Sequence, residues 1–252
     1  MCGIAGYIGE LRITKPIVKR TLVLMQNRGP DFKNFYKTLV KNKNILLLHS
    51  RLSIIDLESR SNQPFQKDDL VLIFNGEIYN YLEIKSKLKK KYKFTTKSDT
   101  EVLIKAFREY GEKCVDHFIG MWAFAIWDEK KKELFLSRDH FGEKPLYYFK
   151  SNSGFFFGSE IKFIKSLCKK KFNENKKLIN SFLFQGYKSL NKSNNTYYNQ
   201  IYSLENSTNI KINLNLDFKK KKYWSPKLKI DKSINLKDAS EEVKNYLHKS
   251  LK

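Results

Sequence analysis

Apolar residues fall along the chain in patterns that predict both strands and helices. Residues 3–8 alternate small and apolar side chains, and two further segments are short continuous apolar runs, 45–49 and 70–74. These patterns are typical of buried strands. Between residues 118 and 160, apolar runs also occur as two pairs, each joined by a turn, at 121–127 with 134–137 and at 146–149 with 155–157. Successive hairpins of this kind predict antiparallel sheets.

Three segments carry an apolar face at helical spacing, namely residues 18–25, 81–88 and 98–110. The third has the clearest limits, because Ser98 and Glu101 form a capping-box sequence and Gly111 ends the pattern. Strands in hairpins together with separate helices predict an α+β fold class rather than a parallel α/β sheet.

The pattern changes in the last quarter of the chain. Residues 191–195 are polar and loop-like, 201–216 have weak strand character, and 223–226 resemble a junction. We therefore predict one domain over residues 1–205, followed at 206–252 by a linker and a helix. The apolar stripe of that helix consists of Leu236, Ala239, Val243, Leu247 and Leu251. Such a stripe needs a partner to cover it.

The net charge of +23 raises the hypothesis of a nucleic-acid partner. The lysines occur in short runs at expected turns, however, and arginine, which base recognition favours, is scarce. We therefore expect a solvated basic surface and no nucleic-acid partner, with a nucleic-acid role kept as a third choice.

Several features bear on the compartment. No apolar run approaches the ~20 residues of a membrane span, so no membrane partner is expected, and the N-terminus lacks a secretory signal pattern. The three cysteines, Cys2, Cys114 and Cys168, indicate neither a disulfide framework nor a zinc site. A cytoplasmic location is the simplest interpretation.

Cys2 is the first candidate for chemistry. Methionine is normally removed before a small residue, so the mature chain would begin with Cys2 and carry a thiol and a free α-amine on one residue. An α-amine titrates near pH ~8, so it can accept the thiol proton at neutral pH. Nucleophile and base then come from the same residue. The alternative is a small apolar residue at the start of a strand.

Four other segments accompany the cysteine, and three of them provide groups that hydrolysis of a glutamine side-chain amide would need. Asn75 and Gly76 offer an amide and a backbone N–H to an oxyanion. Arg51, at the end of an apolar strand, can hold an α-carboxylate, and Asp99 can hold an α-ammonium group. The fourth segment, residues 28–31, reads RGPD. Taken singly, each also fits an ordinary turn or helix end.

The motifs together resemble the glutaminase domain of glutamine-dependent asparagine synthetases, which are class II glutamine amidotransferases. The matching motifs cover about residues 2–165 and are, in order, CGIAGYIG, RGPD, HSRLSIIDL, FNGEIYNY, SDTE, GMWAFAIWD, LSRDHFGEKPLYY and GSEIKFI. The resemblance implies a four-layer αββα sandwich of the N-terminal nucleophile (Ntn) hydrolase fold, with two antiparallel sheets flanked by helices.

The resemblance also implies roles for individual residues. Cys2 would be the nucleophile and its amine the base, Asn75 and Gly76 the oxyanion hole, and Arg51 the carboxylate ligand. Glu77 and Asp99 would lie near the ammonium group, while RGPD would be a structural loop. Glutamine would give a glutamyl thioester and ammonia, and water would then release glutamate. No cofactor or metal is expected for this reaction.

Alternatives remain open within this class and outside it. Glucosamine-phosphate and phosphoribosyl-pyrophosphate amidotransferases share the opening cysteine, and related enzymes serve sugar or peptide acceptors, whereas β-lactam synthetases usually lack the cysteine. The SGGxDS loop that binds ATP in asparagine synthetases does not occur in the chain. We therefore expect ATP, Mg and aspartate chemistry only on a synthetase domain that is missing or on a separate chain. Residues 206–252 would then be a linker and the first helix of a truncated synthetase domain. A further alternative for the function is an inactive fragment with a binding role. A homodimer is a possible assembly.

Overall fold

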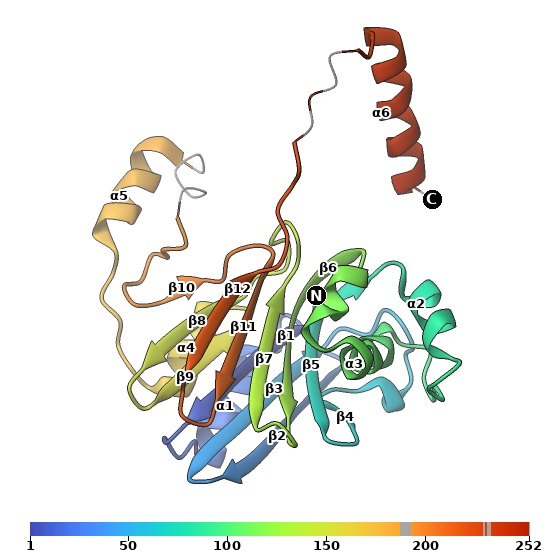
Figure 1. Ribbon diagram of the computed structural model, residues 1–252. Helices are drawn as coiled ribbons and strands as arrows, with labels where there is room; N and C mark the ends of the chain where they lie inside the picture. Colours follow the sequence, from blue (N-terminus) through green and yellow to red (C-terminus); the bar gives the residue numbers. More distant parts are fainter. Residues whose placement is uncertain (187–192, 229, 231–232, 252) are drawn as a thin grey trace.

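The computed structural model describes residues 1–186, 193–228, 230 and 233–251. Two antiparallel sheets lie face to face between two groups of helices (Figure 1). The first sheet has the order β10 (Tyr202–Ser203), β8 (Tyr147–Ser151), β9 (Gly154–Gly158), β1 (Gly3–Gly9), β3 (Lys43–Arg51) and β2 (Phe32–Val40). The second has the order β12 (Phe218–Lys222), β11 (Thr208–Asn213), β7 (Glu133–Arg138), β6 (Gly120–Asp128), β5 (Leu70–Ile78) and β4 (Phe65–Lys67).

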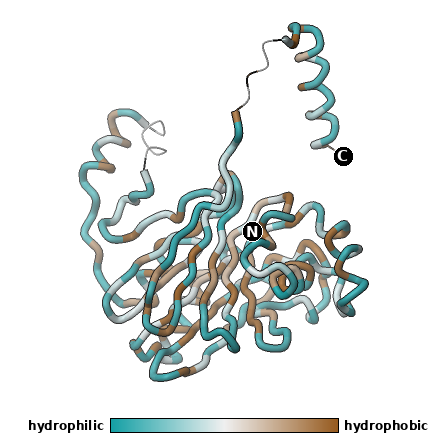
Figure 2. The backbone as a smooth tube through the Cα atoms, viewed as in Figure 1, coloured by the Kyte–Doolittle hydropathy of each residue, from teal (hydrophilic) through white to brown (hydrophobic). Residues whose placement is uncertain are grey.

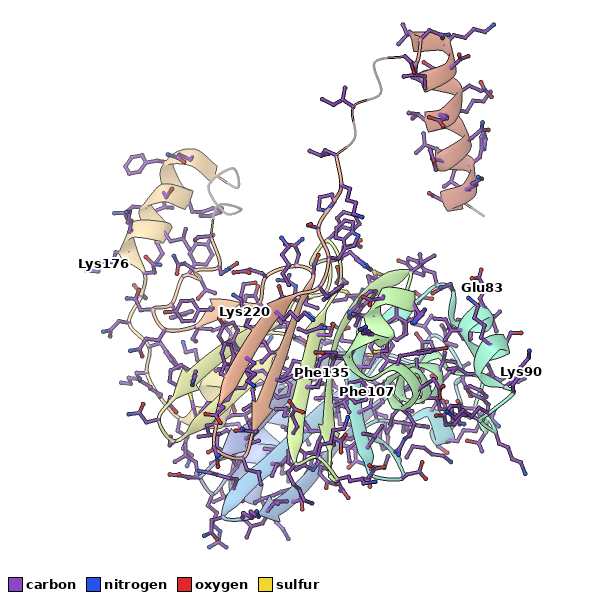
Figure 3. All side chains as sticks on the ribbon, in the orientation of Figure 1. Glu83, Lys90, Phe107, Phe135, Lys176 and Lys220 are labelled. Atoms are coloured by element: carbon purple, nitrogen blue, oxygen red, sulfur yellow. The ribbon has the colours of Figure 1, made fainter. Side chains whose placement is uncertain are left out.

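Helices cover the outer face of each sheet. The α-helices are α1 (Lys15–Leu24), α2 (Tyr81–Leu88), α3 (Asp99–Tyr110), α4 (Ile161–Cys168), α5 (Lys176–Gln185) and α6 (Leu236–Leu251), and short 3-10 helices span Ser59–Ser61 and Gly111–His117. The helices α1 and α4 pack on the first sheet, whereas α2 and α3 pack on the second. On the α3 side, the rings of Phe107 and Phe135, labelled in Figure 3, have centroids 5.1 Å apart.

The buried strands read as continuous apolar runs because both faces of each sheet are covered. In β5, Val71 and Ile73 belong to the core between the sheets, while Leu72 and Phe74 belong to the core beneath α3. Successive side chains of a strand point to opposite faces, so each run supplies two cores at once. The predicted α+β class and its four layers are confirmed.

The predicted strands and helices occur close to their expected limits, but some elements escaped the pattern. Strand β2 is an edge strand with several exposed positions, and four of the five residues of β12 are lysines. Neither presents the apolar run of a buried strand. Strands β11 and β12, at residues 208–222, belong to the second sheet together with β4 to β7. This sheet therefore contains residues from both sides of the boundary predicted at 205–206.

The capping box predicted at α3 is half right. Ser98 caps the helix, since its hydroxyl accepts a hydrogen bond from the Thr100 N–H. Glu101 does not reach back to Ser98. Its carboxylate instead accepts the backbone N–H groups of Thr95 and Thr96 and pairs with Lys105 at 2.9 Å. The segment before the helix therefore donates the hydrogen bonds to the Glu101 carboxylate, in place of the Ser98 N–H that a capping box would use.

The C-terminal part is the least integrated. Helix α6 has no buried residue, and it lies apart from the sandwich in Figures 1 and 2. Leucines of its apolar stripe are exposed: Leu236 is 84% accessible and Leu251 is 85% accessible. The loop predicted at 191–195 lies partly outside the described residues.

Candidate active site

Three predicted site residues lie at or near strand ends at one edge of the sandwich. Cys2 precedes β1, Arg51 ends β3 and Asn75 lies in β5. Each lies an even number of residues from a side chain of the core between the sheets, so the alternation directs all three into that layer. The reference side chains are Ile4, Leu47 and Ile73.

One pocket at this edge contains every predicted site residue. It is lined by Cys2, Arg51, Asn75, Gly76, Glu77 and Asp99, together with neighbours that include Met1, Gln63, Thr100, Met121 and Lys144. The site residues come from four separate segments, and the fold brings them together.

The Cys2 thiol is half-buried and held against the backbone of Leu52. The Leu52 N–H donates to Sγ at 3.4 Å, and Sγ lies 3.6 Å from the Leu52 carbonyl oxygen. Burial raises the pKa of this thiol, while the Leu52 contact and the charges of the N-terminus and Arg51 oppose the rise. The thiol therefore needs a base to become a nucleophile.

The RGPD segment holds the cysteine in place from outside the pocket. The Arg28 Nε–H donates to the carbonyl of Cys2 at 3.0 Å, and its Nη1 pairs with Glu160 at 3.3 Å. Asp31 accepts the N–H of Ser53 at 2.7 Å, in the loop that follows β3. These contacts match the structural role expected for RGPD.

Asn75 and Gly76 form a donor pair at the pocket wall. The Asn75 Nδ2 group is buried and has no hydrogen-bond partner in the protein, so it is available to an acceptor that enters the pocket. A Cβ at Gly76 would lie 2.2 Å from the Met121 carbonyl oxygen and 2.7 Å from the Trp122 Cα. Only glycine fits between β5 and β6 at this point.

Asp99 occupies the first turn of α3, inside the pocket. It is 5% exposed, and its Oδ2 accepts the Ile78 N–H at 3.2 Å. Burial, with the nearby charge of Glu77 adding to it, raises the pKa of Asp99 to about 6, although the Ile78 and Thr100 N–H groups oppose the rise. A buried carboxylate in such a site favours a cationic ligand.

Arg51 is engaged differently from the expectation. Its Nη1 donates to the Glu58 carbonyl at 3.1 Å and to the Asn62 side chain at 2.8 Å, while its Nη2 contacts the carbonyls of Ile55 and Asp56. The guanidinium thus holds the loop after β3. A carboxylate ligand would have to displace some of these carbonyls, so this role stays a prediction.

Comparisons with known proteins agree with this geometry. The family model described as "Glutamine amidotransferase domain" matches residues 1–224. The chain belongs to the glutamine amidotransferase domain family.

Two relatives from Bacillus subtilis show the nature of the similarity. The chain is 40% identical to asparagine synthetase [glutamine-hydrolyzing] 3 over 65% of this chain and 27% of the relative. It is 36% identical to asparagine synthetase [glutamine-hydrolyzing] 2 over 89% of this chain and 31% of the relative. The chain spans less than half the length of these relatives.

The solved structure of a glutamine phosphoribosylpyrophosphate amidotransferase from B. subtilis has the same fold. It superposes with a TM-score of 0.64 at 18% identity, over 89% of this chain and 50% of that one. At this identity the likeness establishes the fold alone, which is the Ntn-hydrolase sandwich expected from the motifs.

Some pocket residues of this amidotransferase domain were not predicted. Lys144 is 6% exposed, and its ammonium group lies 3.2 Å from the Met1 sulfur. It stands in the GEKPLYY stretch of the matching motifs, which was the available signal. Thr100 stands in the SDTE motif in the same way, whereas Gln63 lies outside all the matching motifs and had no such signal.

Within the described part of the chain, no group of three or more His, Cys, Asp or Glu side chains is arranged to hold a metal ion. In the same residues, no helix has the length and apolar character needed to cross a membrane.

Proposed function

We propose that this domain hydrolyses the side-chain amide of glutamine through a thioester on Cys2. The observation that carries the proposal is the unpartnered amide of Asn75 in the pocket that also contains the Cys2 thiol. A nucleophile and a buried donor beside it are the two groups that acyl transfer needs first.

The base in this mechanism is the α-amine of Cys2 after removal of Met1. The amine takes the thiol proton, and Sγ attacks the amide carbon of glutamine. Asn75 Nδ2 and the Gly76 N–H stabilise the oxyanion. The protonated amine then donates its proton to the leaving nitrogen, the C–N bond breaks, and ammonia departs. Water, activated by the same amine, hydrolyses the thioester to glutamate and restores the thiol.

Recognition of glutamine would use charge. The carboxylate of Asp99, with Glu77 beside it, would bind the α-ammonium group, and Arg51 would bind the α-carboxylate. All the groups of this reaction come from the chain and the substrate, so it requires no cofactor. It does require Cys2 as a free thiol, which a reducing, cytoplasmic setting provides.

A glutaminase assay tests the proposal. Cys2→Ser keeps a small second residue, so Met1 removal is preserved, but the nucleophile is weaker, and we expect glutamate formation to fall at least about 1000-fold. The control is Cys168→Ala, because Cys168 is also half-buried and free but does not line the pocket. Equal activity of Cys2→Ser and the wild type would refute the proposal.

The role of a longer protein is a further proposal, based on the names of the relatives. In an asparagine synthetase, the ammonia would amidate aspartate activated by ATP and Mg on a synthetase domain, in the same chain or a partner, with a homodimer as one assembly. A relative from Gibberella zeae is named amidase chry2 and is 34% identical over 64% of this chain. Other acceptors, such as a sugar or peptide, therefore stay as the alternative. An assay of the longer protein with glutamine, aspartate and ATP distinguishes aspartate from these other acceptors, because asparagine forms only if aspartate is the acceptor.

A further inference from the structure

The backbone N–H and carbonyl of Phe74, the residue immediately before Asn75, are each held by a side chain that no part of the proposed reaction uses. The Gln63 Oε1 atom accepts the Phe74 N–H at 2.6 Å. The His49 Nε2 atom lies 3.1 Å from the Phe74 carbonyl oxygen. That carbonyl belongs to the peptide unit that joins Phe74 to Asn75.

These contacts occur where the sheet offers no strand on one side of β5. Strand β6 pairs along β5 through Asn75 and beyond, but β4 pairs only with residues Leu70 to Leu72. Phe74 lies two residues past the last of these pairs. The side chains of Gln63 and His49 therefore take the place of a neighbouring strand, and they fix the direction of β5 just before the donor pair.

His49 is suited to this contact in one protonation state. It is fully buried, and burial lowers the pKa of its ring to about 3, so the ring is neutral at physiological pH. Because Nε2 faces a carbonyl oxygen, it carries the proton and donates it. The Nδ1 atom is buried and has no hydrogen-bond partner. A buried polar atom without a partner destabilises the fold, so an apolar side chain would fill this position at a lower free-energy cost.

Gln63 connects the two halves of the site. It is 4% exposed and lines the pocket. While its Oε1 holds Phe74, its Nε2 donates to the Thr100 hydroxyl at 3.3 Å. Thr100 follows Asp99, and Phe74 precedes Asn75. One side chain thus spans from the ammonium-binding end of the pocket to the oxyanion-binding end.

We propose that His49 and Gln63 are positioning residues, which align the Asn75 amide and Gly76 N–H with the oxyanion by holding the backbone N–H and carbonyl of Phe74. This inference rests on the proposed glutaminase reaction. A misplacement of about 1 Å at a reacting group can cost about 100-fold in rate, so loss of either contact lowers kcat more than it changes KM for glutamine.

The test compares paired variants in the full chain. His49→Leu removes the donor and keeps most of the volume, whereas His49→Gln restores an N–H at about the Nε2 position. We expect His49→Leu to lower kcat about 10- to 100-fold and His49→Gln to recover most of that loss. Gln63→Met, which removes both hydrogen bonds at similar volume, should behave like His49→Leu. The matched control is Gln66→Met, at an exposed position of β4.

A second readout separates positioning from general loosening of the fold. Alkylation of Cys2 by iodoacetamide, followed by peptide mapping, needs the thiol but no oxyanion donor. We expect its rate to stay within about twofold of the wild type in His49→Leu and Gln63→Met while kcat falls. Unchanged kcat in both variants, a parallel fall in alkylation, or equal losses for His49→Leu and His49→Gln would overturn the inference. Absence of turnover in the wild type would instead refute the proposed function.

Discussion

At the scale of single residues, Asp99 connects the geometry of the pocket with a measurable pH dependence. Its burial and the charge of Glu77 raise its pKa to about 6. Above pH 6 the group is a carboxylate and can pair with the ammonium group of glutamine. Below pH 6 it binds a proton and the ion pair is lost, so affinity for glutamine falls as the pH decreases.

This dependence can be measured without turnover in Cys2→Ala. We expect the Kd for glutamine to rise about tenfold between pH 7 and pH 5, as the charged fraction of Asp99 falls. Isothermal titration calorimetry at several pH values gives the curve. In the double variant with Asp99→Asn, binding should be weak and nearly independent of pH over this range. A pH-independent Kd with Asp99 intact would contradict the assignment.

Gly76 supports a second prediction at this scale. The methyl group of Gly76→Ala would collide with the Met121 carbonyl and the Trp122 backbone, neither of which is a flexible side-chain end. We expect a loss of about 1–3 kcal/mol in the free energy of unfolding and about a 100-fold fall in kcat as the donor pair shifts. Chemical denaturation and the glutaminase assay measure the two effects.

Gly158→Ala is the matched control for Gly76→Ala, because a Cβ at Gly158 has its nearest neighbour at 3.3 Å. We expect kcat for this variant to be near that of the wild type. A Gly76→Ala protein with unchanged kcat would show that the donor pair is elsewhere.

At the scale of elements, helix α3 presents Asp99 to the pocket and is anchored by a buried ion pair. Glu101 is fully buried and Lys105 almost fully buried. Glu101 also accepts hydrogen bonds from four donor groups, the backbone N–H and the hydroxyl of both Thr95 and Thr96. Removing one partner of such a pair leaves the other charge buried and unpaired.

We therefore expect Glu101→Ala to lower the free energy of unfolding by about 3–5 kcal/mol. The control is Glu83→Ala on α2, an exposed position labelled in Figure 3, where a change within about 0.5 kcal/mol is expected. Urea unfolding followed by circular dichroism compares the two variants. Similar stabilities for both would mean that the ion pair does not anchor the helix.

The elements also show what the sequence could and could not predict. The apolar strands and the limits of α3 were predictable because periodicity and capping are local properties. The partner of Glu101 was not, because the capping-box pattern omits the Thr95–Thr96 segment that competes for its carboxylate. Likewise, the position of Arg51 at the end of an apolar run gave no sign that its guanidinium donates hydrogen bonds to carbonyl groups of the loop that follows.

At the scale of the whole molecule, the sandwich is complete without α6. The helix buries no residue among those described, and the second sheet ends at β12. We expect deletion of residues 233–252 to shift the melting temperature of the sandwich by less than about 1 °C, because few contacts are lost. The glutaminase rate should also be unchanged. A large fall in either quantity, measured by calorimetry and by glutamate release, would show that α6 docks on the sandwich.

That the predicted site residues come together in one pocket was predictable at this scale, because the motifs resemble those of one family, in order, over about residues 2–165. The positioning contacts of His49 and Gln63 were not predictable, because they depend on where β4 stops pairing with β5. Such an end of pairing is a property of the folded sheet and leaves no periodic signal.

The measurement that tests the central claim most directly is the intact mass of the protein before and after 6-diazo-5-oxonorleucine, a glutamine analogue that alkylates such cysteines. We expect a chain that begins with Cys2 and gains one adduct, which peptide mapping assigns to Cys2 and not to Cys114 or Cys168. A chain that begins with Cys2 and gains no adduct would contradict the account. So would glutamine turnover by a chain that retains Met1.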